Sequence, residues 1–124
     1  MRQLEKEKQK KEKKEHILVC LSSSPSNEKI IRTAAQMAQA FQAGFTALYV
    51  QTAEKTEKTP EDLARLQKHV RLAEQSGAEI VTTHSEYIAL QIAEYARISE
   101  VTRIVIGKSM MKQGYFHQRR VWTE

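Results

Sequence analysis

The chain lacks the features that mark membrane, secreted and metal-binding proteins. Its 124 residues include a single cysteine, Cys20, which excludes a disulfide framework and fits a reducing compartment. No apolar run reaches the length of a membrane span, and the N-terminus has no hydrophobic signal core. No pair among the four histidines has metal-ligand spacing, so we expect no zinc site. These absences predict a soluble chain that resides in the cytosol.

Motifs of catalysis and of classical nucleotide binding are also missing. The sequence contains neither GxGxxG nor a Walker A run, and no Ser/His/Asp or Cys/His constellation suggests an activated nucleophile. Cys20 lies inside an apolar run, which favours a core position over a reactive thiol. We therefore expect no catalytic residue, no metal and no resident cofactor in this chain.

Positive charge is concentrated at the start of the chain. The formal net charge is +5, and residues 1–15 hold seven basic and four acidic side chains, which accounts for +3 of it. This segment favours a solvated helical linker, and membrane-surface binding is the weaker alternative because no apolar face accompanies the lysines. Nucleic acid is not an expected partner, since no aromatic residues interleave with the basic ones. We expect a charged linker or helix at 1–15 and one domain at 16–124.

Apolar runs alternate with helical patterns along the rest of the chain. The first run, HILVCLS, is apolar on both sides, which is typical of a strand buried on both faces of a parallel sheet. The expected strands are 16–22, 45–50, 78–83 and 102–107. Periodic apolar residues predict a helix after each of the first three strands. This order predicts an α/β fold with a doubly wound, open parallel sheet of at least four strands.

Capping residues mark the ends of the expected helices. Ser24 or Ser26 is suited to cap the first helix, which we expect to end at Gly44 in a left-handed conformation. Thr59, followed by a proline and two acids, is typical of the start of the second helix, and Gly77 is suited to end it.

The last part of the sequence is less regular. Residues 108–118 show no clean period, and RRVWTE at 119–124 is expected to begin a further helix. The large apolar side chain of Trp122 so near the last residue indicates missing packing partners or a chain that continues.

Ligands of open parallel sheets bind outside the carboxyl ends of the strands. The segments that reach this edge are 22–24, 49–51, 83–84 and 107–109. We therefore expect any ligand to contact side chains from these four segments.

Each of these segments has a functional and a purely structural interpretation. The serines at 22–24 offer hydroxyls and N–H groups beside a helix N-terminus, which attracts phosphate, but serines here also serve as helix caps. Gly107 permits close backbone approach or only forms a turn. Lys108 adds positive charge at a site or is only a solvated side chain. His84 is a polar strand-end residue or a group that stacks on a base.

Several segments resemble a known family when they are taken together. These segments are ILVCLSSSPSNEKIIRTAAQMA, FTALYV, RLAEQSGAEIVT and VTRIVIGKS. They resemble the universal-stress-protein-like domain of the Gram-positive type of KdpD, a family of potassium-responsive sensor histidine kinases, over about residues 16–109. The resemblance implies strand order 3-2-1-4 and a cytoplasmic regulatory module of a membrane-bound, dimeric kinase. It implies no catalytic activity for the domain itself.

The resemblance suggests two nucleotide ligands. ATP-binding universal stress proteins carry an aspartate after the first strand and a Gly-x2-Gly-x9-Gly-Ser/Thr run after the fourth. Here Ser22 and its neighbours replace the acid, Met110 replaces the second glycine, and no Gly-Ser pair stands at Arg120-Val121. These departures disfavour ATP as the ligand.

Cyclic di-AMP fits the sequence better. Some KdpD domains that bind this ligand carry Ser-x-Ser, twenty residues, and then Phe-Thr-Ala-x-Tyr, and residues 22–24 and 45–49 match this pattern without a gap. Tyr49 is expected to stack on, or hydrogen-bond to, an adenine, whereas Phe45 begins at the far end of its strand. The alternative is a ligand-free module that docks to other domains of the parent kinase. The expected ligand contacts are Ser22, Ser23, Ser24, Phe45, Thr46, Ala47, Tyr49, His84, Gly107, Lys108 and Ser109.

Overall fold

The computed structural model describes residues 14–52, 58–108 and 121–123. Strands and helices alternate along the chain up to the fourth strand. The elements are β1 (His16–Cys20), α2 (Asn27–Ala40), β2 (Gly44–Gln51), α3 (Pro60–Gln75), β3 (Glu79–His84), α4 (Ile88–Ile98), β4 (Arg103–Ile106) and β5 (Val121–Thr123).

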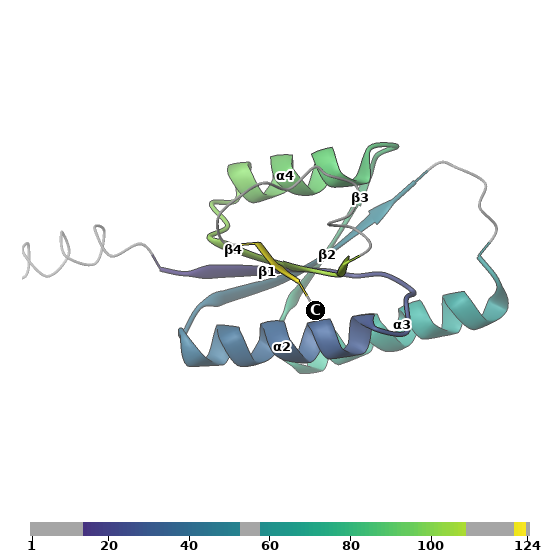
Figure 1. The fold of residues 1–124 in the computed structure, drawn as a ribbon, viewed down its shortest axis with the longest axis horizontal. Coiled ribbons are helices and arrows are strands. Elements are labelled where there is room, and N and C mark those ends of the chain that lie inside the picture. Colours follow the sequence, from purple (N-terminus) through teal and green to yellow (C-terminus); the bar gives the residue numbers. More distant parts are fainter. Residues whose placement is uncertain (1–13, 53–57, 109–120, 124) are drawn as a thin grey trace, which may run out of the picture.

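The strands form one sheet in the order β3-β2-β1-β4-β5, and each pair of neighbours is parallel. Helices α2 and α3 cover one face of this sheet and α4 covers the other (Figure 1). The predicted doubly wound α/β fold and the order 3-2-1-4 are therefore confirmed.

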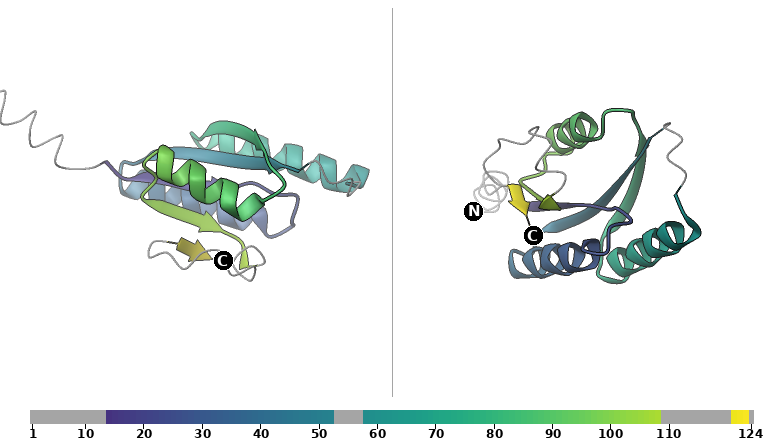
Figure 2. Two further views of the ribbon diagram at one scale, coloured as in Figure 1. Left: turned by 90° about the horizontal axis from the view of Figure 1, so that it is seen from above. Right: turned by 45° about the vertical axis from the view of Figure 1, so that its right-hand side comes forward.

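The end of the chain differs from the prediction. The expected helix at 119–124 is wrong, because Val121–Thr123 forms a strand that pairs with β4 at the edge of the sheet (Figure 2). β-Branched and aromatic residues favour a strand here. Pairing also satisfies the backbone groups along the outer edge of β4, which would otherwise lack partners.

Strand β1 lies at the centre of the core. Ile17 and Val19 are fully buried against α2 and α3, and Leu18 is fully buried on the α4 face. Each such side chain contributes about 1.5–3 kcal/mol relative to an exposed one. The prediction of a strand buried on both faces is confirmed, and the two packed layers fix the loop that follows β1.

The helix ends agree with the sequence at α3 and differ at α2. Thr59 and Asp62 form the expected capping box, and Gly77 has a φ of +96° after α3. At the end of α2 the left-handed residue is Gln42, with a φ of +49°, and Gly44 already begins β2. The expected stop at Gly44 is wrong because the Gly44 N–H donates to the Glu15 carbonyl at 3.0 Å, which draws it into the sheet.

The charged segment at 1–15 lies outside the described residues except at its end. Glu15 is half-buried, and its carboxylate lies 3.4 Å from the Arg103 guanidinium at the start of β4. Within the described ranges, no helix is long and apolar enough to cross a bilayer.

Asn27 fixes the loop between β1 and α2. This first residue of α2 is only 2% exposed. Its side-chain Nδ2 donates to the Cys20 carbonyl at 2.9 Å, and its Oδ1 accepts from the Ser22 N–H at 3.1 Å. The amide group therefore holds the chain at the point where β1 ends.

Replacing Asn27 by alanine tests this anchor. We expect Asn27→Ala to lower the free energy of unfolding by about 2–3 kcal/mol, since the buried Cys20 carbonyl and the partly buried Ser22 N–H lose their partners and an unsatisfied buried group costs about 1–3 kcal/mol. The change is measured by urea denaturation followed by circular dichroism. Gln36→Ala, at an exposed position of the same helix, is the control and should shift stability by less than about 0.5 kcal/mol. Equal stability of the two variants would contradict the anchoring role.

Candidate functional site

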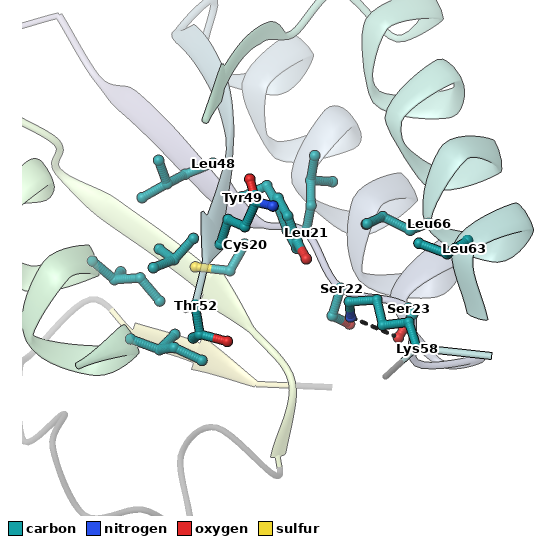
Figure 3. Close-up of a pocket in the computed structure, with 14 residues that line it drawn as sticks. Cys20, Leu21, Ser22, Ser23, Leu48, Tyr49, Thr52, Lys58, Leu63 and Leu66 are labelled. Carbon is teal, nitrogen blue, oxygen red and sulfur yellow. Dashed lines mark hydrogen bonds between the residues drawn. The ribbon is translucent and has the colours of Figure 1, made fainter. Parts of the chain in front are cut away.

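A pocket of about 540 Å³ opens at the carboxyl ends of β1 and β2 (Figure 3). Its polar lining comes from Ser22, Ser23, Tyr49, Gln51, Thr52 and Lys58. Its apolar lining comes from Cys20, Leu21, Leu48, Val50, Leu63, Leu66, Ile88 and Ile92. The pocket lies at the sheet edge where the sequence predicts ligand binding, and it draws residues from both faces of the sheet.

Two side chains of α3 hold the serine loop. His69 is buried, and its Nδ1 lies 2.7 Å from the Ser22 carbonyl oxygen. A carbonyl oxygen can only accept, so Nδ1 carries the proton and donates. Arg65 donates to the Ser23 carbonyl at 2.9 Å and pairs with Asp62 at 3.2 Å. Both loop carbonyls are therefore engaged by α3, which fixes the position of the two serines at the pocket.

The N–H groups of Ser24 and Ser26 have partners within the loop itself. The Ser24 N–H donates to the Ser22 hydroxyl at 3.2 Å, and the Ser26 N–H donates to the Ser24 hydroxyl at 3.4 Å. The Ser24 and Ser26 hydroxyls lie 2.9 Å apart outside the pocket, and Ser26 occupies the cap position without a side-chain capping bond. These two N–H groups are therefore not available to a ligand. The groups that the loop offers at the pocket are mainly serine hydroxyls.

The expected contacts on β2 separate into one pocket residue and three others. Tyr49 lines the pocket. Phe45 and Ala47 are buried in the core on the α2 and α3 side, and the Thr46 hydroxyl lies 2.8 Å from His16 Nε2. Because a strand advances about 3.3 Å per residue, Phe45 begins about 13 Å before Tyr49. Of the four expected contacts on β2, the structure therefore brings only Tyr49 to the pocket.

The remaining expected contacts that the structure describes lie outside the pocket. His84 is exposed at the end of β3, in register with Gln51. Gly107 and Lys108 follow β4 without lining the pocket, and Ser109 lies outside the described residues. Ile88 and Ile92 of α4 line the pocket, and the described residues Gly107 and Lys108 do not. In the sheet, β4 lies on the side of β1 that faces away from β2.

Sequence reasoning missed Lys58, Arg65 and His69. His69 carried a usable signal, because it lies three residues after Leu66 and four before Ala73, on the buried stripe of α3. A histidine on such a stripe needs a polar partner, and the end of a neighbouring strand supplies one. Lys58 had no such signal, since it follows a polar loop and precedes the cap at Thr59.

Cys20 is the one thiol of the chain, and it lines the pocket. Burial raises the pKa of the Cys20 thiol to about 12, so this side chain stays protonated and is a poor nucleophile near neutral pH. Among the described residues, no three His, Cys, Asp or Glu side chains are grouped so that they could hold a metal ion. The arrangement of hydroxyls, an ammonium group, an aromatic ring and apolar walls is suited to binding.

Comparison with known proteins places the chain in a family. The model of the universal stress protein family matches residues 14–112. The chain belongs to this family. It is 42% identical over 100 residues to the sensor protein KdpD of Clostridium acetobutylicum and 30% identical over 93 residues to that of Escherichia coli K12. These matches cover 81% and 74% of the chain, which spans 11% and 10% of the two KdpD proteins.

Solved structures agree on the fold. The universal stress protein from Archaeoglobus fulgidus in complex with dAMP matches with a TM-score of 0.62 and 19% identity, over 88% of this chain and 96% of its own length. A likeness at this level of identity shows a shared fold. The KdpD relatives carry the closer sequence similarity, as the segments compared above led us to expect.

Cys20 gives a direct test of burial at the site. We expect the native thiol to react with iodoacetamide at pH 8 far more slowly than the urea-unfolded chain, because its raised pKa leaves almost no thiolate. The folded pKa exceeds the unfolded value of 9.0, so this thiol favours the native state below about pH 9 and the contribution is lost as the pH rises toward 12.

Mass spectrometry of the labelled chain and denaturation at several pH values measure both effects. Cys20→Val, which lacks the thiol, is the control and should lose less stability between pH 8 and 10 than the wild-type chain. Native labelling as fast as labelling of the unfolded chain would show that Cys20 is not buried.

Proposed function

We propose that this chain is a regulatory domain of a KdpD-type sensor histidine kinase that senses cyclic di-AMP. The proposal rests on the similarity to KdpD proteins and on the Ser-x-Ser and Phe-Thr-Ala-x-Tyr pattern of the sequence. The parent protein would carry the kinase activity in other domains, and this domain would lie on the cytoplasmic side of the cell membrane. Its further partners would be those other domains, in a dimeric kinase.

One observation carries the choice of ligand. Ser22, the first serine of the pattern, lines the same pocket as Tyr49 from the second half, although twenty residues separate the two halves in sequence. Ser23, at the variable position of the pattern, also lines this pocket, whereas Ser24 lies outside it. Strands β1 and β2 are neighbours in parallel register, which brings their carboxyl ends together. This proximity of Ser22 and Tyr49 supports a ligand that contacts both halves of the pattern.

The chemistry of the pocket suits an adenine dinucleotide. Leu63, Leu66 and Ile92 offer apolar surface for a base, and the Tyr49 ring offers a stacking face or a hydroxyl partner. The serine hydroxyls and the Lys58 ammonium are suited to phosphate oxygens. The volume of about 540 Å³ lies within the range of about 300–1,000 Å³ that is usual for small-molecule sites.

The buried members of the pattern have a supporting role in this proposal. Phe45 and Ala47 pack into the core beneath α2 and α3, with exposed fractions of 9% and 0%. Side chains of the right size there set how β2 lies against the helices, and this fixes the position of Tyr49 at the end of the strand. We therefore propose Phe45, Thr46 and Ala47 as residues that position the site without touching the ligand.

A mononucleotide is the second candidate ligand. The universal stress protein from Archaeoglobus fulgidus, which shares this fold, has been solved in complex with dAMP. The glycine run typical of ATP-binding members is interrupted in this sequence at Met110, which lies outside the described residues. Titration with cyclic di-AMP, ATP and AMP separates the two candidates.

A pair of serine variants tests the proposal. We expect Ser23→Ala to weaken cyclic di-AMP binding about five- to tenfold, since it removes one hydroxyl partner of the ligand, worth about 1 kcal/mol. Ser26→Ala is the matched control, because this serine belongs to the same loop and lies outside the pocket. Isothermal titration calorimetry measures both affinities, and the control should bind as the wild-type chain does.

Two results would contradict the proposal. The absence of binding heat with cyclic di-AMP for the wild-type chain would leave the ligand-free docking module as the better description. Tighter binding of ATP or AMP than of cyclic di-AMP would replace the dinucleotide by a mononucleotide.

A further inference from the structure

We propose that the Lys58 ammonium moves from the Tyr49 ring to the phosphate of the ligand and so leaves the ring face free for the base. The site therefore selects ligands that have both a base and a phosphate. This inference rests on the proposed function and deepens it. Lys58 stands outside the Ser-x-Ser and Phe-Thr-Ala-x-Tyr pattern, just before α3. Its side chain nevertheless lies over the residues that the pattern brings together (Figure 3).

The Lys58 ammonium has weak partners in this structure. Its Nζ lies 3.5 Å from the Ser23 hydroxyl oxygen and 5.8 Å from the centre of the Tyr49 ring. Both distances are near the outer limit for a hydrogen bond and for a cation–π contact. The two contacts that hold the Lys58 ammonium at the pocket are therefore weak.

No carboxylate among the described residues pairs with Lys58, whereas two basic side chains of α3 have acidic partners. Arg65 pairs with Asp62 at 3.2 Å, and Lys68 lies 3.7 Å from Glu28. A positive charge at a pocket that has no anionic partner among the described residues is suited to bind an anion from solution. The phosphate of a nucleotide supplies both the charge and several strong acceptor oxygens.

Lys58 lies where it affects the binding of both the base and the phosphate of a nucleotide. A base that stacks on Tyr49 needs the ring face that the Lys58 ammonium approaches, so the base and the ammonium compete for this face. The four-carbon stem of lysine is flexible and lets the ammonium move without a change in the backbone. A phosphate near Ser23 would draw Lys58 to itself and leave the ring free for the base.

This exchange gives the site its selectivity. A nucleoside has a base without a phosphate, so it must displace Lys58 from the ring and offers the ammonium nothing in return. Inorganic phosphate binds Lys58 without the stacking contact. A nucleotide satisfies both groups together, and its two contacts support each other through one lysine side chain.

Calorimetric titrations at several salt concentrations test this inference. We expect Lys58→Met, which keeps most of the stem and removes the charge, to weaken cyclic di-AMP binding about ten- to a hundredfold, the range for loss of a charged hydrogen bond. The salt dependence of the affinity should also become shallower, because one ion contact is gone. Lys58→Arg should keep most of the affinity.

A matched control and a second probe complete the experiment. Lys68→Met changes an exposed lysine of the same region that does not line the pocket, and it should bind as the wild-type chain does. Adenosine should bind Lys58→Met at least as tightly as the wild-type chain, because the ring is uncovered and no phosphate contact is lost. A merely structural role for Lys58 would weaken both ligands alike.

The outcomes separate this inference from the proposed function. If the wild-type chain does not bind cyclic di-AMP, both proposals fail. If it binds, and Lys58→Met binds with the same affinity and the same salt dependence, the role of Lys58 is refuted and the proposed function stands. Weaker binding of adenosine by Lys58→Met would refute the exchange at the Tyr49 ring.

Discussion

Strand β1 is paired along both edges and packed on both faces, and the site depends on this position. Its neighbours β2 and β4 fix it by backbone pairing, and side chains such as Ile17 and Leu18 are fully buried on opposite faces. A strand held in this way has no freedom to shift, since a slip of one residue would turn each core side chain to the wrong face. The serine loop starts at the end of this strand, so the fixed position of β1 also fixes where the loop begins.

The loop itself is held by polar side chains from two helices, of which Asn27 and His69 are buried. Asn27 binds the backbone on either side of the end of β1, and His69 and Arg65 bind the carbonyls of Ser22 and Ser23. These contacts satisfy the backbone within the protein and leave hydroxyl groups at the pocket. Such an arrangement favours recognition of a ligand by preorganised groups, which lowers the entropy that binding must overcome.

Local patterns predicted the parts of the structure whose causes are local. The apolar run at β1 and the Thr59 cap needed only neighbouring residues to be recognised, and the strand order followed from the family resemblance. The left-handed residue fell at Gln42 instead of Gly44, because pairing with Glu15 overrode the preference of glycine. The pairing of Val121 with β4 likewise depends on a contact distant in sequence.

The site was predicted in part for the same reason. Ser22 and Tyr49 were found because strand ends meet at one edge. Lys58, just before α3, and His69, within α3, reach that edge because of where this helix lies, which the sequence does not reveal. Residues 14 and 15 join β1 at its amino end, and the pocket lies beyond its carboxyl end. A strand of five residues spans about 17 Å. Residues 14–15 and the candidate pocket therefore lie at opposite ends of one buried strand that is paired along both edges.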